Sequence, residues 1–517
     1  MNKKLCGIVE GFFSSPVKRW TSAQRLATVQ FFIRDYPGFN TYLYCPKDDP
    51  YVKKWWNLLY PKKKLKDLLE IARLCKKNNI TFVYGLNPAF SLQKIQRDFD
   101  THLKKIEVKI TQLASIGVNT FCILYDDIPF AYSVLSGEQD KNELAIGQMQ
   151  ARVMNKLIAS YNETGMTFWF CPTDYFFTRK TPYLKGLMDA LNPAIPLLWT
   201  GESVFVKKVT KSMLSRAQKV AGPERTIIWW DNYPVNDCEH TVGTFHIGAF
   251  NAPDKSARQG LGGILINPMR EAYANFIAYD TFHQYLKNPT VYSRAHAVKK
   301  SFERYFPEKP TAYLRVYTAF SDRNIVDTNA QSYIQNILHT KKDTRVAEFL
   351  RRMKADISFL KKTKSRSRQA LLFLKSTQTL IRKAENRHSL YEAIMQNKKW
   401  HRHFRELDKL PVVMEKRYWN KLYRVMDQRL RYTHGLHKDT IDRAHINARD
   451  YASFRKIASF YRTANKLTVP TPAWIRFRTL LKKLIIEEQK CFLSAIDKQS
   501  PLEKVKRTIE RSLLNGY

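Results

Sequence analysis

The sequence predicts an α/β protein, a (β/α)8 TIM barrel followed by a C-terminal bundle of α-helices. Three observations predict this fold. Short apolar runs rich in β-branched and aromatic residues recur eight times within about the first 290 residues. Segments with apolar residues three and four positions apart lie between many of them, as amphipathic helices require. After about residue 310 the strand pattern stops and helical spacing alone continues.

The eight runs are mostly continuous rather than alternating, which is typical of parallel strands covered by helices on both faces. The expected strands are Leu5–Val9, Thr41–Tyr44, Thr81–Tyr84, Thr120–Leu124, Thr167–Cys171, Pro196–Trp199, Thr226–Trp230 and Gly263–Ile266. Helices are expected between them, including Lys63–Asn78, Thr101–Ile116 and Ala145–Tyr161. Eight such repeats in this length favour a closed barrel over an open doubly wound sheet.

The remainder of the chain predicts a separate, all-α domain. Its long glycine-poor stretches with helical spacing include Arg345–Asn386, Val412–Tyr432, Thr440–Lys466 and Trp474–Asp497. Since 517 residues exceed one ordinary core, we expect a barrel domain over residues 1–300 and a basic helical domain over residues 301–517.

The chain has a formal net charge of +41, of which residues 301–517 carry +26 and residues 1–300 carry +15. Such a field attracts polyanions in a salt-dependent way, so an acidic polymer is a candidate partner of the helical domain. The alternative is that the lysines and arginines are solvated helix faces with no ligand. Charge alone names no partner.

Composition also bears on location and cofactors. The first strand begins at Leu5, which leaves no room for a signal peptide, and no run approaches the ~20 apolar residues of a membrane span. A cytoplasmic protein without membrane contact is expected. The seven cysteines are scattered, with no C-x-x-C pair and no Cys/His spacing for zinc, so we expect reduced thiols, no metal and no cofactor.

Polar residues follow nearly every expected strand, and barrel active sites are built from the loops at the carboxyl ends of the strands. These positions read Glu10-Gly11, Pro46-Lys47-Asp48-Asp49, Asn87-Pro88, Asp126-Asp127, Pro172-Thr173-Asp174-Tyr175, Thr200-Gly201, Asp231-Asn232 and Asn267-Pro268. Each alone is an ordinary turn or helix-cap sequence. Together around one rim, the carboxylates, amides and lysine favour a polyhydroxylated ligand.

Asp126 and Asp127 place two carboxyl groups side by side where the fourth strand ends. Like charges this close favour one ionised and one protonated group near neutral pH. Ordinary two-carboxylate glycosidases separate their carboxyls by about 5 to 9.5 Å across the scissile bond. Sequence neighbours fit a substrate-assisted route better, in which the 2-acetamido oxygen of the sugar is the nucleophile.

Several stretches in the first 285 residues resemble glycoside hydrolase family 84, which contains the O-GlcNAcases and bacterial β-N-acetylglucosaminidases. They are Val9–Phe13 with Trp20 and Gln24-Arg25, Asn40–Asp49, Ile123–Ile128, Phe170–Tyr175, Leu198–Gly201, Trp230–Asp237 and Ile266–Met269. The resemblance implies a retaining exo-β-N-acetylglucosaminidase that removes terminal β-linked GlcNAc from a protein or glycan through an oxazoline intermediate.

The resemblance also implies residue roles. Asp126 would orient the acetamido group, and Asp127 would act as general acid and then general base. Gly11, Lys47, Asp237 and Asn267 match positions that bind the sugar hydroxyls. Tyr175 and Asn232 match positions that fix the acetamido group and the catalytic pair. Cys171, Trp199 and Trp230 match the walls around the acetyl methyl group. For both tryptophans, packing in the core is the alternative.

The sequence departs from the family pattern in two loops. Phe13 stands where the family usually has Tyr, Ser14 where it has Gly, and Asn87-Pro88-Ala89 replaces Ser-Pro-Gly. Two other functions therefore stay open: a GlcNAc-binding pseudo-enzyme, and a polyanion-binding protein that acts through its helical domain. The natural aglycone and the oligomeric state stay open as well.

Overall fold

The structure is a computed structural model that describes residues 4–13, 19–88, 98–126, 139–237, 245–321, 343–363, 367–382, 384–385 and 388. The described residues fall into two compact units. The first holds the described residues up to 235 together with 249–297, and the second holds 236–237, 245–248 and the described residues from 298 onward. Each unit is described by itself.

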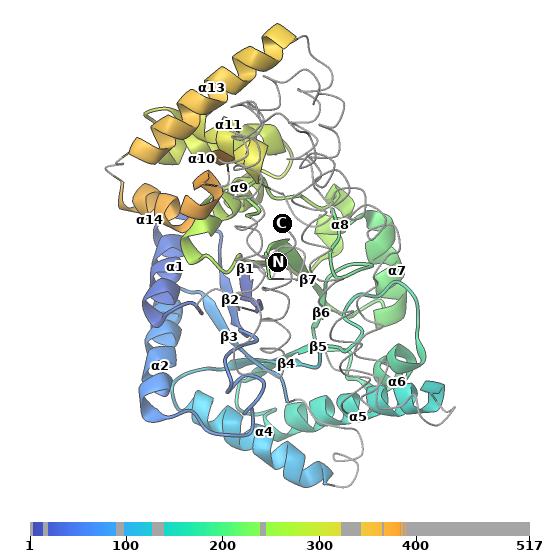
Figure 1. Ribbon diagram of the computed structural model, residues 1–517. Helices are drawn as coiled ribbons and strands as arrows, with labels where there is room; N and C mark the ends of the chain where they lie inside the picture. Colours follow the sequence, from blue (N-terminus) through green and yellow to red (C-terminus); the bar gives the residue numbers. More distant parts are fainter. Residues whose placement is uncertain are drawn as a thin grey trace, which may run out of the picture. The chain divides into compact units, whose positions relative to one another are not determined.

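The first unit is a closed barrel of eight parallel strands, in which each strand pairs with the next and the eighth pairs with the first (Figure 1). The strands are β1 (Leu5–Glu10), β2 (Thr41–Tyr44), β3 (Thr81–Leu86), β4 (Thr120–Leu124), β5 (Thr167–Cys171), β6 (Leu197–Trp199), β7 (Ile227–Pro234) and β8 (Gly263–Asn267). The predicted TIM barrel is confirmed, with all eight expected strands in the expected order.

Of the strands that extend beyond their expected ends, β7 does so by the largest number of residues. β7 continues to Pro234, four residues beyond the expected end at Trp230, and its pairing with β8 shifts register between Asp231 and Pro234. The stretch Asp231-Asn-Tyr-Pro has the composition of a turn. It pairs as a strand because Asn267 of β8 lies opposite Pro234.

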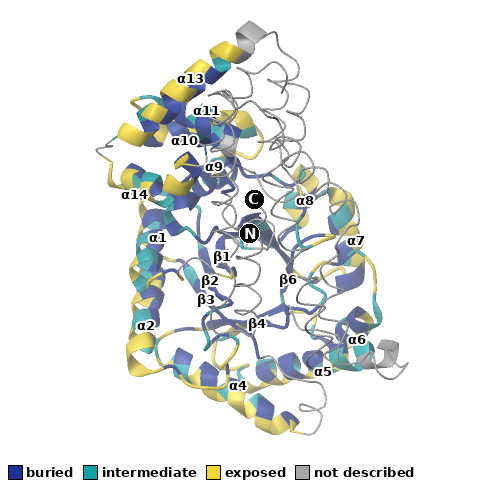
Figure 2. Cartoon of the chain, viewed as in Figure 1, coloured by how far each residue is buried: buried dark blue, intermediate teal, exposed yellow. Residues whose placement is uncertain are grey.

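Helices surround the barrel strands (Figure 1). They are α1 (Ser22–Asp35), α2 (Lys62–Lys77), α4 (Phe99–Ala114), α5 (Gln139–Ser160), α6 (Pro182–Ala190), α7 (Lys211–Ala221), α8 (Lys255–Gly260) and α9 (Phe276–Lys287), with a short 3-10 turn at Ala272–Asn275. Local sequence sets several starts: Thr21 and Gln24 form a capping box before α1, and Thr181 caps α6. The strands are buried, and the helices expose only their outer faces (Figure 2).

The barrel interior is filled by side chains from alternate strand positions. This inner cluster comprises Val9, Leu43, Cys45, Val83, Cys122, Leu124, Trp169, Cys171, Leu198, Ile228, Trp230 and Leu265. Because side chains alternate between the two faces of a strand, these residues define which positions point inward. Residues two positions further along each strand therefore continue the inward series toward the carboxyl ends of the strands.

The described part of the second unit contains α11 (Pro310–Phe320), α13 (Asp343–Lys362) and α14 (Arg368–Ser376), and α10 (Arg294–Tyr305) lies at the boundary between the units. An aromatic core joins these helices, with Phe306 stacked on Tyr313 at 3.9 Å and Phe373 5.3 Å from Tyr317. Arg315 of α11 pairs with the buried Asp356 of α13, with Nε and Oδ2 2.6 Å apart.

The expected helical stretch Arg345–Asn386 is divided in the structure. α13 ends at Lys362, and a new helix begins after Ser367, whose side chain accepts a hydrogen bond from the Ala370 amide. The expected helices Val412–Tyr432, Thr440–Lys466 and Trp474–Asp497 lie outside the described residues. The domain boundary at residue 300 stays a prediction. No helix among the described residues is long and apolar enough to cross a membrane.

Candidate active site

The candidate site begins with Asp126, which continues the inward series of β4 after Cys122 and Leu124. Asp126 is 5% exposed, and its carboxylate makes an ion pair with Lys47 Nζ through Oδ2. The amide Nδ2 of Asn87 donates to Asp126 Oδ1 at 3.2 Å and lies 3.4 Å from its backbone oxygen. An ammonium and an amide thus balance a carboxylate that would be costly to bury alone.

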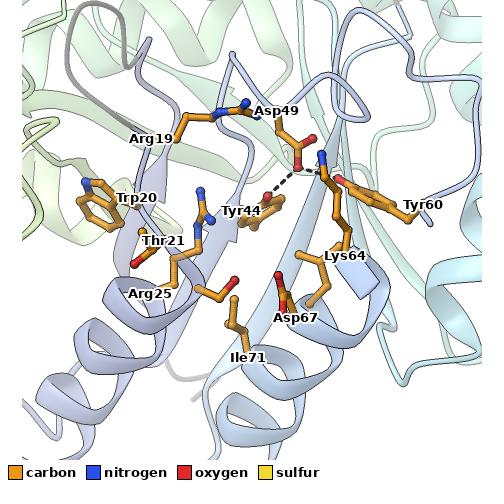
Figure 3. A pocket seen from close by; sticks show the side chains of 12 residues that line it. Arg19, Trp20, Thr21, Arg25, Tyr44, Asp49, Tyr60, Lys64, Asp67 and Ile71 are labelled. Atoms are coloured by element: carbon orange, nitrogen blue, oxygen red, sulfur yellow. Dashed lines mark hydrogen bonds between the residues drawn. The ribbon is translucent and has the colours of Figure 1, made fainter. Parts of the chain in front are cut away.

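Lys47 is held in place by the loop after β2. Asp49 accepts hydrogen bonds from the hydroxyls of Tyr44 at 2.6 Å and Tyr60 at 2.9 Å (Figure 3). It also accepts one from the Tyr51 amide at 3.0 Å. The Asp49 amide in turn donates to the Pro46 carbonyl at 3.0 Å. These bonds fix the turn that carries Lys47, whose side chain is almost fully buried.

A second group of predicted residues forms one hydrogen-bonded network. Asn232 Oδ1 accepts from Trp230 Nε1 at 2.8 Å and from Asn267 Nδ2 at 3.0 Å. Asn267 Oδ1 accepts from the Gly11 amide at 3.3 Å. A Cβ at Gly11 would overlap the Trp230 ring, so only glycine lets β1 approach this indole so closely.

The two groups meet at Trp230. The Lys47 ammonium lies 5.8 Å from the centroid of the Trp230 ring, within the range of a cation–π contact. The structure therefore brings together six predicted site residues, which come from β1, β2, β4, β7, β8 and their loops. They are Gly11, Lys47, Asp126, Trp230, Asn232 and Asn267.

Buried thiols lie beneath this network. Cys171, Cys122 and Cys45 belong to the inner cluster, and burial raises the pKa of each thiol well above its usual value. All three thiols are therefore neutral at physiological pH and form part of the apolar interior below the polar network. Tyr175 packs against the same cluster.

Three predicted residues are not joined to this network by the described contacts. Trp199 is fully buried next to the inward-facing Leu198, and its Nε1 donates to the Phe177 carbonyl at 3.0 Å. Asp237 follows β7 in the chain but belongs to the second unit, which is described apart. Asp127 lies outside the described residues.

Two polar residues at the strand ends were not predicted as site residues. Asn87 continues the inward series of β3 and contacts Asp126 directly, although its sequence signal was only its place after a strand. Asp231 lies between Trp230 and Asn232 on β7. Burial raises the pKa of its carboxyl well above the usual range, which favours the protonated form.

A cavity of about 350 Å³ lies between α1 and α2, outside the barrel interior (Figure 3). Its lining includes Arg25, Tyr44 and Asp49, and Arg25 pairs with the buried Glu10 of β1 at 2.7 Å. None of the predicted site residues that the structure describes lines this cavity. The cavity is connected to the candidate site through Asp49, which lines the cavity and also fixes the turn that carries Lys47.

Comparisons with known proteins agree with this architecture. The sequence model of a family described as beta-N-acetylglucosaminidase matches residues 6–319. The protein O-GlcNAcases of rat and mouse are each 28% identical over 291 residues, a stretch that is 55% of this chain and 30% of each relative. The chain thus matches less than a third of their length. A mutant of the Thermobaculum terrenum O-GlcNAc hydrolase has a similar fold, with a TM-score of 0.66, 20% identity and coverage of 95% of this chain and 96% of that one.

Proposed function

The chain belongs to the beta-N-acetylglucosaminidase family, glycoside hydrolase family 84, and on this premise we propose that it is a retaining exo-β-N-acetylglucosaminidase that uses substrate-assisted catalysis. The observation that carries the proposal is the buried Asp126, balanced by Lys47 and Asn87 directly before Asp127. Terminal β-linked GlcNAc on a protein or glycan is the proposed substrate.

In the proposed first step, Asp126 accepts a hydrogen bond from the acetamido N–H of the sugar. This orients the acetamido oxygen for attack on C1, while the bond from C1 to the aglycone oxygen breaks. Asp127 gives its proton to that oxygen, and a protonated oxazoline forms, whose N–H stays hydrogen-bonded to Asp126. In the second step, Asp127 takes a proton from water, which attacks C1 and reopens the ring. Two inversions at C1 give net retention of configuration.

The remaining contacts support recognition of one terminal sugar. Asn267 is nearly buried, and its amide can turn from Asn232 toward a sugar hydroxyl at little cost because a hydrogen bond is exchanged for another. The proposed hydroxyl-binding residues are Gly11, Lys47, Asp237 and Asn267. Tyr175 and Asn232 would fix the acetamido group, and Cys171 and Trp230 are proposed around its methyl group. For Trp199 the alternative of core packing is favoured, because its neighbour Leu198 faces the barrel interior. The five described cysteines are buried free thiols, which supports a reducing compartment such as the cytoplasm.

The test compares aglycones of different acidity. Asp127→Ala should retain most activity on aglycones of low pKa, which need no proton, while Asp126→Ala should lose about 10²–10⁴-fold on all of them. The exposed Asp189→Ala, on the outside of α6, is the matched control and should behave as wild type. An α-configured first product in NMR spectra, or equal losses for both variants on every aglycone, would contradict the mechanism.

A further inference from the structure

Next to the candidate site, exposed apolar side chains occur together with the exposed Lys54 and the half-buried Lys53 on two loops. We call this set the ledge: Phe13 after β1, and Lys53, Lys54, Trp55, Leu58 and Leu59 after β2. Phe13 and Trp55 are each 43% exposed, Leu58 51% and Leu59 49%. Eight large hydrophobic side chains are this exposed among the described residues, and four of them are in the ledge. Clustered exposed apolar side chains mark interaction sites more often than scattered ones do.

The ledge is firmly held from beneath. The ammonium of Lys109, on α4, donates to the Leu58 carbonyl. Gln112 of the same helix exchanges two hydrogen bonds of 2.9 Å with the backbone of Tyr60. Trp56 is buried and packs against His102, with ring centroids 4.9 Å apart. A loop anchored at three points presents Trp55, Leu58 and Leu59 to the outside as a fixed surface.

The surroundings of the ledge are strongly basic. No acidic residue occurs between Asp49 and Asp67, whereas lysines stand at positions 53, 54, 62, 63, 64 and 66. Lys54 and the four lysines at 62–66 make no ion pair with any residue that the structure describes. Their uncompensated charge complements an acidic partner.

Direct contacts connect the ledge to the candidate site. The Lys53 ammonium lies 5.7 Å from the centroid of the Phe13 ring, and Phe13 is two residues from Gly11. Lys47 N lies 3.4 Å from the Phe12 carbonyl. The Asn87 amide donates to the Val52 carbonyl at 2.8 Å, while the Asn87 side chain holds Asp126. Phe13 of the ledge is thus separated from Gly11 by a single residue. Val52, which precedes Lys53, is bonded to Asn87, the residue that contacts Asp126.

We propose that the ledge binds the aglycone, and that it selects polypeptides with acidic and apolar side chains next to the sugar-bearing residue. The inference rests on the proposed function. Exposed leucines favour a polypeptide over a glycan or a nucleic acid, because Leu58 and Leu59 offer contact to apolar side chains and nothing to hydroxyls or phosphates. The lysines supply the preference for acidic residues.

The experiment uses three substrates: 4-nitrophenyl β-N-acetylglucosaminide, a GlcNAc-serine peptide with acidic and leucine flanks, and the same peptide with lysine flanks. Wild type should prefer the acidic peptide by about tenfold in kcat/KM. Lys53→Gln with Lys54→Gln should remove about three- to tenfold of that preference, and Leu58→Ser with Leu59→Ser should lower kcat/KM for both peptides. The 4-nitrophenyl substrate should be turned over as by wild type in every case.

Lys76→Gln with Lys77→Gln, at the far end of α2, removes the same charge and should leave all three substrates unaffected. Equal use of the acidic and lysine-flanked peptides by wild type would overturn the proposal. The proposal would also be overturned if the ledge variants lost binding to anionic lipid vesicles but kept the wild-type preference between the two peptides. The ledge would then be a membrane-docking surface. If wild type fails on the 4-nitrophenyl substrate, the proposed function is wrong. Fluorescence polarisation with the acidic peptide then tests the ledge alone.

Discussion

Among the residues that were not predicted to belong to the site, Asn87 has the clearest structural role. Its Nδ2 faces two acceptors, Asp126 Oδ1 and the Asp126 carbonyl, so the orientation of the amide is determined. Its Oδ1 is buried and makes no hydrogen bond with a described residue. Asn87 replaces a serine of the family pattern, and we infer that it positions Asp126 against the acetamido group.

A double-mutant cycle tests this positioning role. Asn87→Ala should lower kcat by about 10- to 100-fold with little change in KM, because the loss concerns orientation in the transition state. In an Asp126→Asn background the same substitution should add little, since its effect passes through Asp126. Asn87→Ser should recover part of the activity. Fully multiplicative losses, with a matching fall in melting temperature, would mean that Asn87 only supports the fold.

Gly11 gives a steric prediction at the same scale. Gly11→Ala places a methyl group on the Trp230 ring, and that ring also contacts Lys47 and Asn232. We expect overpacking to cost about 1–3 kcal/mol of stability and activity to fall more than tenfold. Gly11→Ala with Trp230→Leu should recover stability and not activity. Wild-type kinetics in the single variant would show that the site adjusts freely.

Strand alternation explains which site residues could be predicted from the sequence. Gly11, Lys47, Asp126, Asn232 and Asn267 each lie two residues beyond an inward-facing residue of their strand. Asn87 obeys the same rule, but its contact with Asp126 depends on how β3 lies beside β4. Trp199 breaks the rule because Leu198 faces inward, and residue type alone could not show this.

At the scale of elements, α4 supports the loop that carries the ledge, and it contains a buried histidine. Burial, aided by the charge of Lys105, lowers the pKa of His102 to about 4. An unfolded histidine titrates near 6.5. Between these values the unfolded chain binds a proton that the folded chain does not. The contribution of neutral His102 to the free energy of unfolding is therefore fully present above about pH 6.5, and it is lost as the pH falls toward 4.

The prediction is a pH-dependent difference between wild type and His102→Phe, which keeps a ring against Trp56. Going from pH 7 to 4.5, wild type should lose roughly 2–3 kcal/mol relative to this variant in urea unfolding. The exposed His296→Phe serves as the control and should run parallel to wild type. Parallel curves for His102→Phe as well would mean that His102 is hydrated in solution.

Element prediction succeeded where one interaction dominates. Continuous apolar runs identify the strands because burial on both faces demands them. Apolar periodicity did not predict that pairing with β8 extends β7 through a polar stretch, nor that α13 ends before Ser367 and that α14 begins after it. The first feature depends on backbone hydrogen bonds between strands and the second on the Ser367 side chain, which accepts from the Ala370 amide, and apolar periodicity encodes neither.

At the scale of the whole molecule, the net charge of +41 is a bulk property, and composition alone does not identify its function. Part of it has local partners: Lys361, at the end of α13, pairs with Glu385 at 2.6 Å. Lys362 and Arg368 are exposed near it, while Lys364 and Arg366 lie outside the described residues. We propose that this basic run attracts acidic polymers at long range.

The salt dependence of catalysis tests that proposal. The field of exposed charges is screened beyond about 8 Å at physiological ionic strength, so it acts on the encounter with a charged substrate and not on bond breaking. The value of kcat/KM for neutral 4-nitrophenyl β-N-acetylglucosaminide should stay flat from low to high salt, whereas that for an acidic glycopeptide should fall. Replacing Lys361, Lys362, Lys364, Arg366 and Arg368 by Gln should flatten the second profile.

The ledge variant Lys53→Gln with Lys54→Gln separates the two sources of charge. Lysines that touch the bound peptide should still matter at high salt, because charges closer together than the Debye length are screened less than distant ones. A basic run that acts only through its long-range field should matter only at low salt. If the fivefold Gln variant and wild type have the same salt profile with the acidic glycopeptide, the run is a solvated surface, and any remaining preference for acidic substrates must come from the ledge.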